Sequence, residues 1–151
     1  MWEYVQGRWN GTTAAAMYKG PLLKAMAKAY PEHARSARAR WLVLEDNDPA
    51  GYKSSKGVAA KVEAGIRAES LPCRSPDLNV LDYSLWHTIN LRMRKQEKNF
   101  PLQFKESEEQ FKERLKRTAL GLPAAVVSKA VRDMHRRVRM VLTEKGGLFN
   151  E

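Results

Sequence analysis

The sequence predicts an α/β domain, in which a small parallel sheet is followed by helices. An apolar run at 41–44 is stopped by acids and by Pro49, as at the end of a buried strand. A helical pattern comes next, followed by a short predicted strand at 68–71 that Pro72 ends. A strand, helix and strand in succession form a parallel pair through a crossover. From residue 80 onward the apolar residues recur at helical spacing.

The composition fits one globular domain with no membrane partner. The chain has 151 residues, of which 43% are hydrophobic, and this is enough to bury a single core. No apolar run approaches the roughly 18 residues of a membrane span. The single cysteine, Cys73, excludes an intrachain disulfide and any metal site built from several cysteines.

The N-terminal part is expected to form a strand followed by a long helix. Residues 2–9 alternate weakly and are rich in aromatic side chains, which favours a strand, and the Asn-Gly pair at 10–11 indicates a turn. Thr12 or Thr13 can cap the following helix, which the Gly-Pro pair at 20–21 interrupts. Residues 31–40 are expected to form a loop or a helix end.

The middle of the chain carries two acids at the ends of regular elements. The strand that begins at residue 41 ends in acids, and the helix after residue 51 is expected to pack a face of Val58, Ala59, Val62 and Ile66. Asn79 can cap the next helix, which places Asp82 in its first turn. Further along this helix the predicted apolar face consists of Leu85, Trp86, Ile89 and Met93.

The C-terminal third is predicted to be helical. Ser107 and Gln110 form a capping box for a helix that ends at 121–123, and that helix bears Phe111, Leu115 and Leu120. A last helix, ending near the glycines at 146–147, places one apolar stripe at Val127, Val131, Met134, Val138 and Val141.

The net charge of +10 favours a polyanionic partner such as DNA. Lys and Arg outnumber acids seven to three in residues 1–45 and fifteen to eight in 92–151, whereas residues 46–91 carry five against six. Basic segments therefore flank the segment that holds the candidate acids, although a well-solvated surface is the simpler alternative. The candidate nucleic-acid contacts are Arg35, Arg38, Arg40, Arg136 and Arg137.

Asp46 and Asp82 are the candidate metal ligands, and each also has an ordinary structural explanation. Acids at the ends of a strand and a helix can be brought together around a divalent cation. Alternatively, Asp46 belongs to a sequence that commonly forms a turn. Asp82 lies three residues after Asn79 and can form a capping pair with it, which needs no metal.

Two sequence blocks resemble the second and third catalytic blocks of mariner-superfamily DDE transposases. They are DNDP at 46–49 and SPDLN at 75–79 with Asp82 and Trp86, and 35 residues separate Asp46 from Asp82. The resemblance implies a ribonuclease-H-like fold, Mg²⁺ or Mn²⁺ held by both acids, and DNA strand transfer. The family commonly has a histidine where Gly51 stands and a proline where Val80 stands.

The family's first catalytic aspartate has no counterpart here, since residues 1–45 contain no aspartate. We therefore expect an incomplete ribonuclease-H-like core at 1–94 and a helical C-terminal extension at 95–151, from a truncated transposase that is inactive as given. The alternatives are a non-catalytic DNA-binding remnant and an assembly module that pairs with itself or with an intact transposase. A small-molecule substrate is not expected. The expected location is the nucleus if the source is eukaryotic, and the inside of the cell otherwise.

Overall fold

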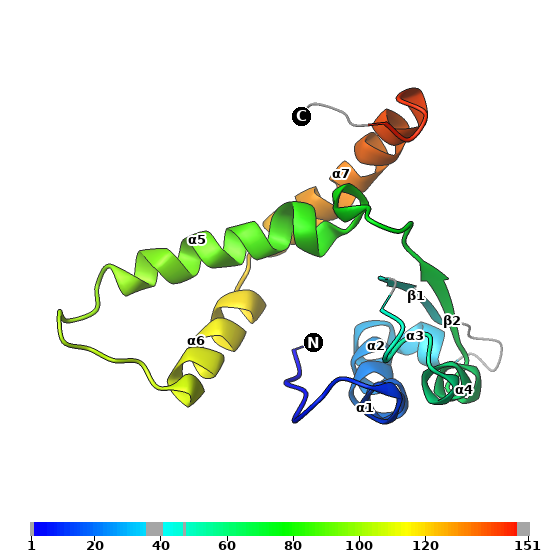
Figure 1. The fold of residues 1–151 in the computed structure, drawn as a ribbon, viewed down its shortest axis with the longest axis horizontal. Helices are drawn as coiled ribbons and strands as arrows, with labels where there is room; N and C mark the ends of the chain where they lie inside the picture. The colour runs from blue at the N-terminus through cyan, green and yellow to red at the C-terminus, as the bar shows by residue number, and fades with distance from the viewer. Residues whose placement is uncertain (1, 36–40, 47, 148–151) are drawn as a thin grey trace. The chain divides into compact units, whose positions relative to one another are not determined.

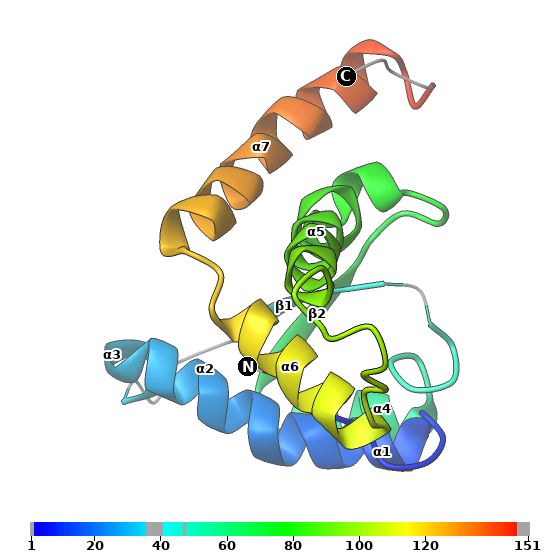
Figure 2. The same ribbon diagram turned by 90° about the vertical axis from the view of Figure 1, so that its left-hand side faces the viewer.

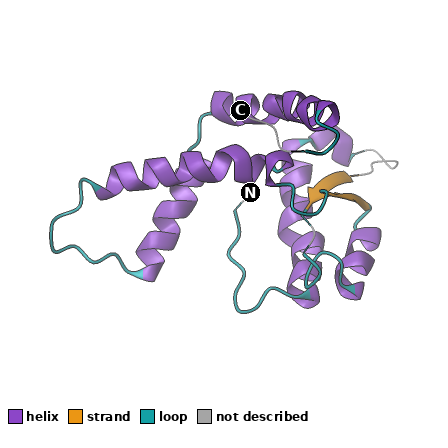
Figure 3. Cartoon of the chain, turned by 45° about the horizontal axis from the view of Figure 1, so that its top comes forward, coloured by secondary structure: helices purple, strands orange, loops and turns teal. Residues whose placement is uncertain are grey.

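The fold was obtained as a computed structural model, which describes residues 2–35, 41–46 and 48–147. The chain divides into two compact units, residues 1–74 and residues 75–151 (Figure 1). This division lies within the stretch 1–94 that the sequence analysis assigns to one core. Two strands, β1 and β2, are found in the first unit, and helices make up the regular structure of the second (Figure 3).

A two-stranded parallel sheet forms one layer of the first unit. Strand β1 (Trp41–Glu45) pairs with β2 (Ile66–Ser70), with Trp41 opposite Ile66. Helix α4 (Ser55–Glu63) connects them, and Ser54 caps it by accepting from the Gly57 amide at 3.1 Å. The predicted strand–helix–strand pair is confirmed, although β2 begins two residues before the predicted strand at 68–71 and ends at Ser70.

A long, interrupted helix forms the other layer of this unit. It consists of α1 (Gly11–Met17), the π-helical η1 (Tyr18–Leu22) and α2 (Leu23–Ala29), which Figure 2 shows as one continuous rod. The predicted interruption at 20–21 takes the form of η1, because proline lacks the N–H that the regular ladder requires. The short α3 (Pro31–Ala34) follows.

Two predictions about the start of the chain are wrong. Residues 2–9 form no strand in the described structure, since no neighbouring strand supplies the hydrogen bonds and Gly7 takes a φ of +75°. The helix cap is Asn10, not Thr12 or Thr13, because the Asn10 side chain accepts from both threonine amides.

The predicted apolar face of α4 is also wrong. The helix buries Gly57, Ala60 and Lys61, whereas Val62 is 75% exposed. The reason is the close packing of small residues between α1 and α4: a Cβ at Gly11 would lie 2.4 Å from the Ser54 Oγ. Larger valines cannot occupy such an interface, so they lie on the outer side.

The second unit consists of helices and their connections. It contains η2 (Pro76–Leu78), η3 (Leu81–Leu85), α5 (Trp86–Glu97), α6 (Glu108–Leu120) and α7 (Ala124–Thr143). The capping box of Ser107 and Gln110 is confirmed at the start of α6. In the described part of the chain no helix is both long and apolar enough to cross a membrane.

The buried faces of these helices differ from the predicted ones. Helix α5 buries Ile89 and Met93 as expected, but Trp86 is exposed. Helices α6 and α7 bury Arg114, Thr118, Ala130 and Arg137 in place of the larger apolar residues of their predicted stripes, which include the exposed residues Phe111, Leu120, Val131 and Val138. An arginine can be buried where carboxylates and aromatic rings surround its guanidinium.

Candidate functional site

Asp46 lies directly after the last residue of β1, as the sequence predicts. Its side chain is exposed, and its Oδ1 accepts a hydrogen bond from the Asp48 amide at 3.1 Å. This bond is typical of an aspartate at the start of a turn. Because the side chain is exposed, a cation can reach this carboxylate from solvent.

Asp48 holds the turn in shape. Its Oδ2 accepts from the Gly51 amide and from the Trp9 indole Nε1, each at 2.8 Å. The Gly51 amide, together with the Trp9 indole, lowers the pKa of Asp48 below its ordinary value. Because both bonds end on the same oxygen and hold the turn, they indicate a structural role for Asp48.

The Trp9 indole also explains the glycine at position 51. A Cβ on Gly51 would lie 2.2 Å from the Trp9 Nε1, which is far inside van der Waals contact. The Trp9 ring additionally packs edge-on against Tyr52, with 5.2 Å between ring centroids. The tryptophan therefore occupies the space that any side chain at position 51 would need.

A buried polar network lies next to Asp46, on the inward face of β1. Tyr18, Glu45 and Lys61 are 1%, 7% and 8% exposed. The Lys61 Nζ lies 2.7 Å from Glu45 Oε2 and 3.0 Å from the Tyr52 carbonyl oxygen, and the Tyr18 hydroxyl donates to Glu45 Oε1. Glu45 thus points into the unit, whereas its neighbour Asp46 is exposed.

This network was not predicted from the sequence, although the alternation of residues in β1 indicates it. Trp41, Val43 and Glu45 alternate with the exposed Leu42 and Leu44, so Glu45 is in phase with the inward residues. Burial and the bond to Glu45 raise the pKa of Tyr18 well above its ordinary value. Ionisation of this hydroxyl at high pH therefore opposes folding, since the folded state favours the neutral form.

Asp82 lies in the first turn of η3, as predicted. Its side chain is exposed, and its Oδ2 accepts from the Asn79 Nδ2 at 2.8 Å. Asn79 in turn accepts from the Leu81 amide at 3.1 Å, which is helix-capping geometry. The capping pair is therefore present, and it leaves the second carboxylate oxygen of Asp82 without a hydrogen bond among the described residues.

The two candidate ligands belong to different units, Asp46 to the first and Asp82 to the second. Neither forms an ion pair within the described ranges, and carboxylate oxygens are the ligands that Mg²⁺ prefers in proteins. Over those same ranges, no three His, Cys, Asp or Glu side chains are grouped so as to hold a metal ion. Either carboxylate has the chemistry that Mg²⁺ needs, since the ion is commonly bound by one or two carboxylates together with waters and substrate phosphates.

The candidate DNA contacts have different surroundings. Arg35 is exposed and pairs with Glu32 at 3.0 Å, whereas Arg38 and Arg40 lie outside the described residues. Arg136 is exposed on α7. Arg137 is only 4% exposed, and its guanidinium lies 4.0 Å from the centre of the Tyr83 ring. This side chain therefore packs inside the second unit.

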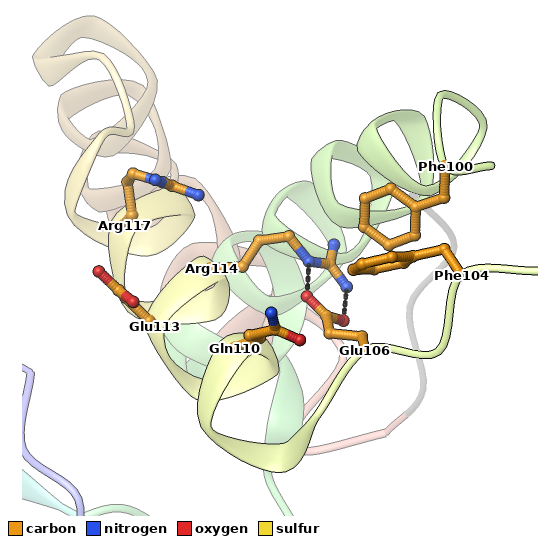
Figure 4. Close-up of a pocket in the computed structure, with 7 residues that line it drawn as sticks. All are labelled: Phe100, Phe104, Glu106, Gln110, Glu113, Arg114 and Arg117. Atoms are coloured by element: carbon orange, nitrogen blue, oxygen red, sulfur yellow. Dashed lines mark hydrogen bonds and ion pairs between the residues drawn. The ribbon is translucent and has the colours of Figure 1, made fainter.

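A pocket of about 220 Å³ lies beside Arg114 in the second unit, between the start of α6 and two phenylalanines (Figure 4). Arg114 donates to both oxygens of Glu106 at 2.6 Å and to Glu97 at 3.0 Å. The two bonds from Arg114 to Glu106 lower the pKa of Glu106, so this contact weakens only as the pH falls below the usual carboxyl range. The guanidinium is fully engaged and joins α5 to α6, which indicates a structural role.

The described structure is similar to solved transposase domains. The catalytic domain of Mos1 mariner transposase matches with a TM-score of 0.73 and 19% identity, over 95% of this chain and 66% of that chain. A structure of the Mos1 catalytic domain with raltegravir and Mg matches with the same score and identity, over 95% and 67%. No family model and no curated protein sequence matches.

These matches confirm the predicted fold class. The chain has the α/β, ribonuclease-H-like fold of a mariner transposase catalytic domain, and it spans about two thirds of the length of the domains it matches.

Proposed function

We propose that this chain forms part of a DDE-type transposase catalytic domain, in which Asp46 and Asp82 bind Mg²⁺ or Mn²⁺ and the substrate is DNA. The observation that carries the proposal is the fold match over 95% of the chain, combined with an exposed aspartate at each of the two motif positions. A neighbour is a transposase domain structure with Mg, which supports a metal-dependent activity. The proposal includes no membrane partner and no small-molecule substrate.

The chemistry follows from the positions of the two acids. A bound divalent cation polarises a phosphodiester and activates a water or a 3′-hydroxyl for attack. Asp46 would hold the ion from the end of a strand, and Asp82 from the first turn of a helix, so that both ligands come from regular elements. The buried pair behind Asp46 and the Asn79 bond to Asp82 limit how far either carboxylate can move.

The 151 residues supply two of the three acids that such a site uses. No aspartate precedes Asp46, and two-metal chemistry requires ions about 3.5–4 Å apart with bridging ligands. We therefore propose that these residues alone bind metal and DNA without cutting DNA. The alternative is a module that binds DNA, or that pairs with itself or with an intact transposase.

The metal site is tested by titrating the ¹⁵N-labelled chain with Mn²⁺. The Trp9 indole donates to Asp48, two residues from Asp46, so its NMR signal is expected to broaden as Mn²⁺ binds. We expect Asp46→Asn to raise the Mn²⁺ midpoint at least about tenfold, because Mn²⁺ and Mg²⁺ sites depend on carboxylate oxygen. Asp82→Asn is expected to have a similar effect if both acids hold one ion.

The matched control is Asp77→Asn, which removes an exposed acid from the same SPDLN block without touching either ligand. The Mn²⁺ midpoint of Asp77→Asn is expected to equal that of the wild type. Equal midpoints for the wild type and Asp46→Asn would contradict the proposed site.

DNA binding is expected to be weak, independent of sequence and strongly dependent on salt. If about five phosphates are contacted, the log–log plot of affinity against salt should have a slope near −4.5. Arg136→Gln, at an exposed position of α7, should reduce that slope by about 1. Fluorescence anisotropy with a labelled duplex measures both values, and a salt-independent affinity would exclude phosphate contacts as its source.

A further inference from the structure

We propose that Lys61 is a positioning residue for Asp46: its ammonium group ties the end of β1 to the loop at Tyr52 and thereby sets the turn that carries the carboxylate. The role of Asp46 as a metal ligand rests on the proposed function. The tie itself is visible in the geometry of the first unit.

Lys61 contacts both ends of the turn. Its Nζ lies 2.7 Å from Glu45, which immediately precedes Asp46, and 3.0 Å from the carbonyl oxygen of Tyr52, six residues after it. One buried ammonium group therefore links the two ends of residues 46–51. The Trp9 indole and the Gly51 amide hold Asp48 in the middle of the same segment.

Stability alone does not account for a charged pair at this place. The side chains of Lys61 and Glu45 are 10% and 5% exposed, and removing two charges from water offsets most of their attraction. Apolar residues of similar size could fill the space with little loss from the charges themselves, but they could neither bond to the Tyr52 carbonyl nor accept from the Tyr18 hydroxyl. The polar pair thus provides a defined turn geometry that apolar packing would not.

Asp46 is the group in this turn that benefits from that geometry. Ligands to Mg²⁺ must meet narrow distances and angles, and partners behind a ligand commonly change metal affinity about 10–100-fold. Glu45 is the strand neighbour of Asp46 and points to the opposite face. Fixing Glu45 through Lys61 and Tyr18 therefore fixes the backbone from which Asp46 projects.

The test uses the full chain carrying Glu45→Met and Lys61→Met together. This double variant leaves the net charge unchanged and keeps the site filled, so we expect it to fold. Its thermal midpoint is expected to lie a few degrees below that of the wild type, because the buried Tyr18 hydroxyl loses its acceptor. Two readouts follow: hydrogen exchange of the Gly51 amide without metal, and the Mn²⁺ midpoint from the Trp9 indole signal. We expect Gly51 to exchange at least about tenfold faster and the Mn²⁺ midpoint to rise about tenfold.

Lys56→Met is the matched control. Lys56 lies on the same helix, is exposed and contacts Thr12 at 3.1 Å, so neither readout should change. A double variant that folds and shows wild-type exchange and a wild-type Mn²⁺ midpoint would overturn the inference.

The two proposals fail in different ways. If Asp46→Asn does not alter Mn²⁺ binding, the proposed metal site is wrong, and the metal-free exchange of Gly51 still decides whether Lys61 holds the turn. If Mn²⁺ binding depends on Asp46 but not on the buried pair, the proposed function stands and the positioning role of Lys61 is excluded.

Discussion

The single substitution Lys61→Met is expected to lower the free energy of unfolding by about 3–5 kcal/mol, because it leaves the Glu45 carboxylate buried without its cation. Glu45 is 7% exposed, and its remaining partner is the Tyr18 hydroxyl. Urea denaturation followed by tryptophan fluorescence measures the change. Three of the four tryptophans, Trp2, Trp9 and Trp41, lie in residues 1–74 and report on this unit.

Two other variants show whether the loss comes from the unpaired charge. Lys56→Met on the same helix is expected to change stability by less than about 0.5 kcal/mol, since its side chain is exposed. Adding Glu45→Met to Lys61→Met should restore part of the lost stability, because the unpaired buried charge is removed, although the Tyr18 hydroxyl then lacks its acceptor. A Lys61→Met protein as stable as the wild type would show that Glu45 is not buried in solution.

Gly51→Ala is expected to destabilise the first unit by about 1–3 kcal/mol, because the added methyl group overlaps the Trp9 indole. The nearest contact would be 2.2 Å from Nε1, so the ring must move and its bond to Asp48 is lost. The indole N–H signal of Trp9 should shift accordingly in the ¹⁵N spectrum. A histidine at this position, as in the family that the sequence resembles, would require a larger displacement of Trp9.

A double-mutant cycle isolates this contact. In a Trp9→Ala background, Gly51→Ala should lower the free energy of unfolding by less than it does in the wild type, because the ring that the added methyl group meets is absent. Gly20→Ala is the control, since a Cβ there meets nothing within 4 Å and its φ is not in the left-handed region. Additive effects of Trp9→Ala and Gly51→Ala would argue against the overlap.

Local signals in the sequence predict the strand and helix positions well where the chain itself supplies the cause. Pro49 and the acids stop β1, the capping box starts α6, and the Gly-Pro pair produces η1. Residues 2–9 show where such signals fail. Their alternation suits a strand, but a strand also needs a neighbour to pair with, and pairing depends on parts of the chain that are distant in sequence.

The positions of the candidate acids at element ends follow from the motifs, but their surroundings do not. The motifs predict Asp46 after a strand and Asp82 in a first helical turn, and both placements are confirmed. They do not identify Lys61, because a lysine in an amphipathic helix is usually exposed. Only the packing of α4 against the sheet shows that this lysine meets a buried glutamate.

The sequence by itself therefore determined the α/β class, the order of the central elements and the two aspartates, since each depends on residues close together in the chain. The tertiary structure decided which helix faces are buried, why position 51 is glycine, and which side chains hold the Asp46 turn. These features arise where segments such as Trp9 and Gly51, or Glu45 and Lys61, come together from distant positions. Close packing and the cost of an unpaired buried charge then select the residues at each contact.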